Sequence, residues 1–408
     1  MRAARVSLLT MILACGSAEP APRDPQPSTG EQTPNPTPAP SVTFERLDAD
    51  PECDGLLPDH APAPVEVART PPTGQVCAGG SSDGTGSVAV AARGEEGASW
   101  QVYGAGGEPR GRPFSAWPVS PQPSGWHGLS VAPAGGPNGG NAVAHAVFGP
   151  DGTSLASHQV SRDPSLVDTH RWSLAADPLG GGMALVAQTD LFHNHWAGLR
   201  AQRFDPAGAP RWAEPVQFGA RSEPTVHFVA AGVSRRGESL ALWQHSALLD
   251  VSWQNAAGEE VTGAERAERS ADVLGSDALA HAIDLVPLLD GGLAVRADGA
   301  FRRVYPHLGT ASVPLPGWLA ARAAWSFRLT RGNRGYALFP PPGAASADCG
   351  QAIELRAPSG RLCGRVILPD DGEPCATGIL DQGWDGTVVQ QRTADGCAYR
   401  FWPRLLGS

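Results

Sequence analysis

The stretches "FGPDGT" at residues 148–153 and "FDPAGA" at residues 204–209 are two copies of one short turn sequence. Four more stretches follow the same plan: "YGAGGE" at 103–108, "QNAAGE" at 254–259, "YPHLGT" at 305–310 and "RAPSGR" at 356–361. The fifth residue of each is Gly, which a tight turn between two antiparallel strands needs for its left-handed backbone. These glycines recur every 45 to 56 residues, so the sequence indicates a structural repeat of about 50 residues.

A second recurring piece is a Gly-rich step into a short apolar run. It occurs as "GTGSVAVAA", "GGNAVAHAVF", "GGGMALVAQ", "RGESLALWQ", "DGGLAVRA", "NRGYALF" and "DGTVVQQ". Such short runs of Val, Ala and Leu are typical of buried strands rather than helices. A repeat of this length with several short strands predicts an all-β fold, a β-propeller. Residues 46–408 hold about seven such repeats, with six to eight blades admissible.

The last repeat is short, because the chain ends soon after "DGTVVQQRTADGCAYRFWPRLL" at residues 385–406. We therefore expect an amino-terminal strand around "APVEVART", residues 63–70, to complete the last blade and close the ring. A pair of β-sandwiches is the competing architecture, but it does not explain one period along the whole chain. The best helical segment, residues 263–282, is predicted to be a loop or short helix between blades.

The first 14 residues have the pattern of a short export signal. Arg2 and Arg5 form its positive end, and "VSLLTMILA" is its apolar run, which is too short to span a bilayer. The end of this run, with Ile12, Ala14 and Cys15, resembles the lipobox of bacterial lipoproteins. That resemblance implies that the leader is cut before Cys15 and that its thiol is lipidated. The alternative is an ordinary secretory leader cut after Ala18.

Residues 16 and 17 are Gly and Ser. This pair after the Cys resembles the one found in lipoproteins that are sorted to the outer membrane. Residues 15–45 contain many prolines and few large apolar side chains, so we expect a disordered, extended linker. The predicted organisation is a signal peptide at 1–14, a lipidated Cys15 with its linker at 15–45, and a propeller domain at 46–408. The predicted location is the outer membrane, on the periplasmic side or at the cell surface.

Seven cysteines become six when Cys15 is set aside. An even number in an exported protein predicts disulfides. The candidates are Cys53, Cys77, Cys349, Cys363, Cys375 and Cys397. Their clustering favours a bridge between Cys53 and Cys77, with the last four paired among themselves. Bridges between the two terminal clusters are the alternative, because closing a ring would bring the clusters together.

Composition excludes several classes of function. The formal net charge is −10, so nucleic acid is not an expected partner. All 31 basic residues are Arg, which excludes every site that needs a lysine, including the phosphate-binding P-loop. No catalytic serine, zinc-protease or dinucleotide motif is present, so no cofactor, metal or catalytic residue is predicted.

The densest polar cluster is "DLFHNHWAG", which contains Asp190, His193, His195 and Trp196. On a strand, the two histidines would face the same side, where they could bind a ligand or share a metal. An exposed loop between two strands of one blade is the simpler interpretation. The 12 Trp residues could likewise stack on a ligand on one face or fill the contacts between blades.

The carboxyl-terminal stretches "NRGYALFPPPG", "CGQAIELRAPSGRLCG" and "DGTVVQQRTADGCAYRFWPRLL" resemble those of uncharacterised propeller-type lipoproteins of predatory soil bacteria. The resemblance covers about the last 75 residues and brings no active site with it. It implies a membrane-tethered propeller that binds or scaffolds an envelope protein or glycan and is not an enzyme. A periplasmic scaffold of outer-membrane assembly is one alternative. The blades of that family have an Asp followed by Thr-Gly and then Trp, and "FDPAGAPRW" resembles this signature only weakly. A propeller-type polysaccharide hydrolase or lyase is another.

Overall fold

The computed structural model describes residues 41–47, 50–94, 97–133, 141–160, 166–190, 196–218, 226–245, 247–261, 266–274, 283–307, 311–341, 352–369, 379–392 and 397–407. All of these residues belong to one compact unit, Pro40–Ser408. The predicted leader, Cys15 and most of the predicted linker lie outside the described residues, and so do His193, His195, Cys349 and Cys375.

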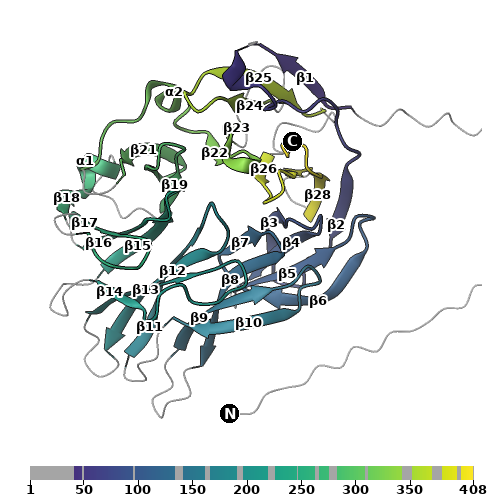
Figure 1. Cartoon of the computed structure of the whole chain (residues 1–408). Helices are drawn as coiled ribbons and strands as arrows, with labels where there is room; N and C mark the ends of the chain where they lie inside the picture. Colours follow the sequence, from purple (N-terminus) through teal and green to yellow (C-terminus); the bar gives the residue numbers. More distant parts are fainter. Residues whose placement is uncertain are drawn as a thin grey trace, which may run out of the picture. The chain divides into compact units, whose positions relative to one another are not determined.

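The chain is a seven-bladed β-propeller (Figure 1), as the repeat predicts, and not a pair of sandwiches. Each blade is an antiparallel sheet in which strands consecutive along the chain are hydrogen-bonded neighbours. Blade 1 contains β3 (Val76–Ser82), β4 (Val88–Gly94), β5 (Gly97–Tyr103) and β6 (Pro109–Ser115); blade 2 contains β7 (Val119–Gln122), β8 (Gly125–Pro133), β9 (Asn141–Phe148) and β10 (Ser154–Gln159). Blade 3 contains β11 (Leu166–Ala176), β12 (Gly182–Asp190), β13 (Trp196–Phe204) and β14 (Val216–Phe218).

The second half of the ring follows the same plan. Blade 4 contains β15 (Val226–Val233), β16 (Ser239–His245), β17 (Leu248–Gln254) and β18 (Arg266–Arg269); blade 5 contains β19 (Ile283–Pro287), β20 (Leu293–Ala297) and β21 (Ala300–Tyr305). Blade 6 contains β22 (Ser326–Leu329), β23 (Tyr336–Phe339), β24 (Ala352–Arg356), β25 (Leu362–Ile367) and β1 (Thr43–Arg46); blade 7 contains β26 (Ile379–Gln382), β27 (Val388–Gln391), β28 (Cys397–Trp402) and β2 (Val65–Arg69).

The amino-terminal segment closes the ring. As expected from the short last repeat, β2 pairs with β28, with Val65 opposite Phe401 and Arg69 opposite Cys397. In addition, β1 pairs with β25 and becomes a fifth strand of blade 6. Residues 43–69 therefore attach to both of the last two blades, where β1 and β2 form the edge strands beyond β25 and β28.

Helices are short and few within the described residues. They are η1 (Pro51–Cys53), α1 (Ser270–Leu274), α2 (Gly317–Ala320) and η2 (Arg331–Asn333). The segment predicted as a loop or short helix, 263–282, does contain α1, but its residues 266–269 form β18 and pair with β17. No helix in this part of the chain has the length and apolarity needed to cross a membrane.

The recurring turn occupies one position in the blades. Gly107, Gly152, Gly208, Gly258 and Gly360 all have φ between 79° and 88° and lie between the third and fourth strands of their blades. In each, the Gly N–H donates to the carbonyl three residues earlier, over 2.8 to 3.0 Å. The sixth copy, with Gly309, lies outside the described residues. Six of the seven Gly-rich steps lead into the second strand of a blade, and "GGNAVAHAVF" leads into the third strand, β9.

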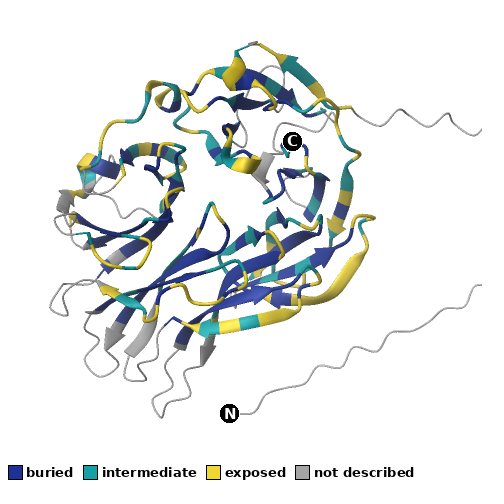
Figure 2. Cartoon of the chain, viewed as in Figure 1, coloured by how far each residue is buried: buried dark blue, intermediate teal, exposed yellow. Residues whose placement is uncertain are grey.

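The core consists of apolar layers, one between each pair of successive blades. The strand β4 shows why its sequence is continuously apolar. Val88 and Val90 pack toward blade 7, whereas Ala89 and Ala91 pack toward blade 2. Both faces of the strand are therefore covered, and small side chains let the blades approach closely. The outer strands β6 and β10 are largely exposed (Figure 2).

Two disulfides join the start of the propeller to its end. Cys53 in η1 is bonded to Cys363 in β25, and Cys77 in β3 is bonded to Cys397 in β28. The favoured pairing of Cys53 with Cys77 is therefore wrong, and so is the pairing of the last four cysteines among themselves. The alternative prediction, bridges between the two terminal clusters of cysteines, is correct for these four residues. Ring closure places the first and last strands side by side.

Charge complementarity accompanies the disulfides. The amino-terminal segment is acidic and the last two blades supply arginines, and the ion pairs are Glu45 with Arg365, Asp50 with Arg361, and Glu66 with both Arg392 and Arg400. Such partly exposed pairs each contribute little to stability, about 0 to 1 kcal/mol. Their main effect is to set the position of the segment along blades 6 and 7.

Candidate functional site

The two ends of the blade strands carry different connections. Because consecutive strands are antiparallel, the first-to-second and third-to-fourth turns leave the sheets at the same end, which we call the turn face. Its first-to-second turns are residues 83–87, 123–124, 177–181, 234–238, 288–292, 330–335 and 383–387. The second-to-third connections and the blade-to-blade connections leave at the other end, which we call the crossover face.

Acidic side chains on the turn face stabilise their own turns. Each accepts a hydrogen bond from the backbone N–H two residues further on, over 2.8 to 3.1 Å: Asp83 from Thr85, Asp177 from Leu179, Asp290 from Gly292 and Asp385 from Thr387. This is the local side-chain turn that Asp favours. One oxygen of each of these four carboxylates is therefore hydrogen-bonded to the backbone of its own turn.

Asp83 and Asp385 come from the first and last blades and are both buried. Burial raises the pKa of the Asp83 carboxyl, the hydrogen bonds from Thr85 and Ser87 act in the opposite direction, and the neighbouring Asp385 raises it further. Ser82 links the two turns, since its hydroxyl is 3.5 Å from Asp385 Oδ1 and its carbonyl accepts from Trp384 N–H. This pair thus belongs to the closure of the ring.

Gln122 connects three blades on the turn face. Its side-chain amide donates to Gly181 O at 2.8 Å and accepts from Gly181 N–H at 2.6 Å, which joins blade 2 to blade 3. The backbone carbonyl of Gln122 accepts from Gly84 N–H at 3.0 Å, which joins blade 2 to blade 1. Gln122 is buried, so these bonds form without competing water.

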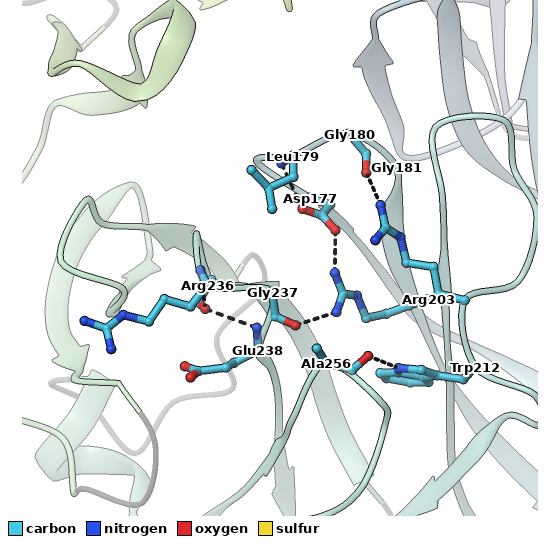
Figure 3. A network of polar contacts seen from close by, with 12 residues as sticks. Asp177, Leu179, Gly180, Gly181, Arg203, Trp212, Arg236, Gly237, Glu238 and Ala256 are labelled. Carbon is cyan, nitrogen blue, oxygen red and sulfur yellow. Dashed lines mark hydrogen bonds and ion pairs between the residues drawn. The ribbon is translucent and has the colours of Figure 1, made fainter.

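Arg203 on β13 joins blades 3 and 4 (Figure 3). Its guanidinium lies 2.5 Å from Asp177 Oδ2 and donates to Gly237 O, also at 2.5 Å. The two side chains are 2% and 0% exposed, so the ion pair is removed from water. Sequence reasoning missed this residue, although an Arg just before the "FDPAG" turn was the available signal. A buried pair of this kind fixes the blade contact rather than offering a reactive group.

The two described residues of the predicted polar cluster, Asp190 and Trp196, lie at strand ends at the crossover face of blade 3. Asp190 ends β12 opposite Leu166, and Trp196 begins β13 opposite Thr189. The segment therefore connects the second and third strands of one blade, as the simpler interpretation states. His193 and His195 lie outside the described residues. In the described part of the chain, no three or more His, Cys, Asp or Glu side chains form a group that could hold a metal.

A stack of aromatic and cationic groups lies where blades 1 and 2 meet. The indole of Trp117, in the blade-to-blade connection before β7, is stacked on that of Trp100 with ring centroids 6.4 Å apart. The guanidinium carbon of Arg93, near the end of β4, lies 5.2 Å from the centroid of the Trp117 ring. Trp100 is buried, Trp117 is half-buried and Arg93 is exposed, so the charged group is on the solvent side.

Blade 3 also contacts this stack. Trp172 in β11 is half-buried and donates from its indole N–H to Trp117 O at 3.2 Å. Trp100 donates to Ala116 O at 3.1 Å, which fixes the same connection from the other side. Sequence reasoning did not select these residues, because nothing in the linear pattern shows which of the Trp side chains meet.

Most other Trp residues are core residues. Those with at most 5% exposure are Trp100, Trp126, Trp212, Trp243, Trp253 and Trp402. Filling of the contacts between blades is thus the main use of Trp in this chain. Trp117 retains exposure and has Arg93 over its ring. The half-buried Trp325 likewise has Arg322 at 4.9 Å, but the guanidinium of Arg322 is paired with Glu354.

No protein-family model and no curated protein sequence matches the chain. Among solved structures, it is similar to the propeller of Dos1, with a TM-score of 0.41, 10% identity, and 82% of this chain and 79% of that chain covered. It is also similar to a catalytically inactive virginiamycin B lyase from Staphylococcus aureus, with a TM-score of 0.40, 9% identity and coverage of 83% and 99%. A protein of unknown function from Dyadobacter fermentans has a TM-score of 0.36, 11% identity and coverage of 75% and 98%. Likenesses at this level concern architecture and carry no conclusion about activity.

Proposed function

We propose that the chain is an exported, lipid-anchored β-propeller that binds a partner at the cell envelope and catalyses no reaction. The two disulfides support export, because structural disulfides persist in oxidising compartments. The anchor rests on the sequence around Cys15, and the outer membrane is the location that Gly16 and Ser17 favour.

The hydrogen bonds and ion pairs of the turn-face carboxylates support a non-catalytic role. Asp83, Asp290 and Asp385 accept hydrogen bonds from their own turns, and Asp177 is paired with Arg203. Most glycoside hydrolases need a carboxylic acid and a carboxylate that are free to face a substrate. These side chains instead hold the ring together.

Arg93 on Trp117 is the observation that carries the binding role. A guanidinium lying over an indole face keeps its in-plane N–H donors available, while the cation–π contact restricts its motion. Within the described residues, Arg93 has no hydrogen bond or ion pair. Glu95 and Glu96 follow it in the sequence and lie outside the described residues. We infer that the Arg93 side chain binds a carboxylate or phosphate group on an envelope glycan or protein.

Substitution of Arg93 tests this role. Arg93→Gln should weaken binding to an acidic polysaccharide, such as a polygalacturonate oligosaccharide, about tenfold, because a charge-assisted hydrogen bond is lost. Arg112→Gln is the matched control, since Arg112 is an exposed arginine of the same blade without a described partner or an indole beneath it. Binding to a phosphorylated or acidic protein in place of the glycan would identify the other partner class. Equal affinities of the two variants would reject Arg93 as the binding residue.

The anchor is tested separately by mass spectrometry of the mature amino terminus. The proposal expects a terminus at Cys15 with a mass increase that corresponds to acyl chains. An unmodified terminus at Glu19 would reject lipidation and would leave a secreted propeller.

A further inference from the structure

We propose that His127 and His145 form a pH-sensitive contact between blades 2 and 3, which is stable when both rings are neutral and opens when either ring takes up a proton. The two side chains lie on neighbouring strands, β8 and β9, and are both 0% exposed. They do not belong to any other site described above, and histidine is the side chain that titrates near neutral pH.

The pair contacts blade 3 through two residues. The imidazole of His145 is stacked on Phe204 of β13, with ring centroids 3.7 Å apart and planes 6° apart. His127 Nε2 is 3.1 Å from the carbonyl oxygen of Pro206, in the turn that follows β13. The two imidazoles also contact each other, since His145 Nε2 is 3.1 Å from His127 Nδ1.

These distances fix both tautomers. The Pro206 carbonyl can only accept, so His127 must carry a hydrogen on Nε2 and present the lone pair of Nδ1. That lone pair accepts from His145 Nε2–H, which leaves Nδ1 of His145 as the unprotonated nitrogen. His145 Nδ1 is buried and has no hydrogen-bond partner. The hydrogen bonds thus run in one direction, from β9 through β8 to the turn of blade 3.

A proton added at either ring breaks this arrangement. On His127 it must go to Nδ1, which faces the N–H of His145 at 3.1 Å. Either two donors then oppose each other, or His145 moves its hydrogen to Nδ1, where no acceptor is found among the described residues. On His145 it must go to Nδ1, which would place a charged donor in an apolar layer without an acceptor. Both events put a positive charge into the contact between blades 2 and 3.

Burial makes protonation unfavourable, although the hydrogen bond to the Pro206 carbonyl acts in the opposite direction on His127. Burial lowers the pKa of both imidazoles, and that of His145 lies well below its ordinary value. The charged neighbours are His158 of β10, which lies opposite His145 in the sheet and opposes its protonation, and Asp205 of blade 3, which favours protonation of His127. Because the folded pKa values are lowered, the unfolded or opened state binds more protons below about pH 6.5. The contact is therefore fully stable above that pH and weakens as the pH falls.

Hydrogen exchange of the native full chain, measured by mass spectrometry at pH 7 and pH 5 and corrected for the intrinsic exchange rate, tests the proposal. Exchange in β8, β9 and β13 should increase between the two pH values, by up to about tenfold per pH unit for each histidine. Exchange in β16 and β17 of blade 4 should change much less. A uniform increase around the ring, or no increase in blades 2 and 3, would overturn the proposal.

Two variants locate the effect. His145→Phe retains an aromatic ring against Phe204 and cannot be protonated, whereas His127 remains. The pH-dependent exchange in blades 2 and 3 should therefore fall by the share of one histidine, up to about tenfold per pH unit. His158→Gln is the matched control, because His158 is partly exposed and lies in the same row of the sheet. Loss of the pH dependence in His158→Gln with its retention in His145→Phe would contradict the proposal. If His145→Phe does not fold, the local comparison in the unaltered chain still decides the outcome.

Discussion

Cys77 and Cys397 are separated by 320 residues in the sequence, yet their Cα atoms lie 5.3 Å apart and their sulfurs are bonded. The bond joins the first strand of blade 1 to the third strand of blade 7, beside the pairing of β2 with β28. A covalent bond thus links the two ends of the propeller, in addition to the strand pairing.

Replacing this pair with Cys77→Ala and Cys397→Ala should lower the free energy of unfolding by about 4 kcal/mol. The Cys53–Cys363 bond still closes the long loop in the unfolded chain, so the variant opens only a further loop of about 60 residues, between Cys53 and Cys77 and between Cys363 and Cys397. Urea denaturation of the variant and of the unaltered protein measures the difference. A second double variant, Cys53→Ala with Cys363→Ala, removes the other disulfide, whose cysteines are 310 residues apart in the sequence. An unchanged midpoint in both double variants would show that the disulfides do not stabilise closure.

Removing the charge of Arg203 should be costly. Arg203→Met leaves Asp177 buried without its partner and should destabilise the protein by about 3 to 5 kcal/mol. The matched control is Arg46→Gln, because the Arg46–Asp59 pair is 55% and 83% exposed and should contribute less than about 1 kcal/mol. Adding Asp177→Asn to Arg203→Met should restore part of the loss. Similar thermal midpoints for the two single variants would refute a structural role for Arg203.

Gly208 allows the turn of blade 3 to contact blade 2. Its φ is 85°, and a Cβ atom at this position would lie 2.3 Å from Val147 Cγ2. Gly208→Ala should therefore cost about 2 to 4 kcal/mol, from backbone strain together with the displacement of Val147. Gly74→Ala separates these two causes, because Gly74 has φ of 80° and open space around it. Its cost should be about 1 to 2 kcal/mol, and thermal unfolding of both variants measures the difference.

Glu354 should make the protein sensitive to acid. This side chain is buried, which raises its pKa, but the hydrogen bonds and charges of Arg322 and Arg356 outweigh burial and lower it overall. A lowered folded pKa means that the stabilisation is present above the unfolded value, near 4.5, and is lost as the pH falls below it.

Measurement of unfolding free energy against pH checks this assignment. Glu354→Gln should be less stable than the unaltered protein at pH 7, and the difference should shrink below pH 4.5. A difference that stays constant down to pH 3 would mean that the charge of Glu354 contributes nothing. Glu108→Gln serves as the exposed control, because its carboxylate is exposed and pairs with Arg110 at the surface.

The architecture could be predicted from the sequence because each blade repeats the same local requirements. A turn such as "FDPAGA" needs Gly at its fifth residue wherever it stands, and a strand covered on both faces, such as β4, needs a continuous run of small apolar residues. The short last repeat likewise indicated the closing strand β2. These features depend on residues close together in the chain, so the linear pattern contains them.

The candidate sites could not be predicted in the same way. Arg93 and Trp117 come from different blades, and so do Arg203 and Gly237, and only the ring places them in contact. The pairing of cysteines was mispredicted for the same reason, since clustering in sequence says little about neighbours in a closed ring. His127 and His145 are close in sequence, but their contacts with Phe204 and Pro206 come from the next blade.

By itself, the sequence determined the all-β repeat, the approximate number of blades and the segment that closes them, because backbone conformation and burial alternate over short distances. Only the tertiary structure decided the disulfide partners, the buried Arg203–Asp177 pair and the histidine contact. Those depend on which side chains meet across two blades, and such meetings are set by the rotation of one sheet onto the next rather than by spacing along the chain.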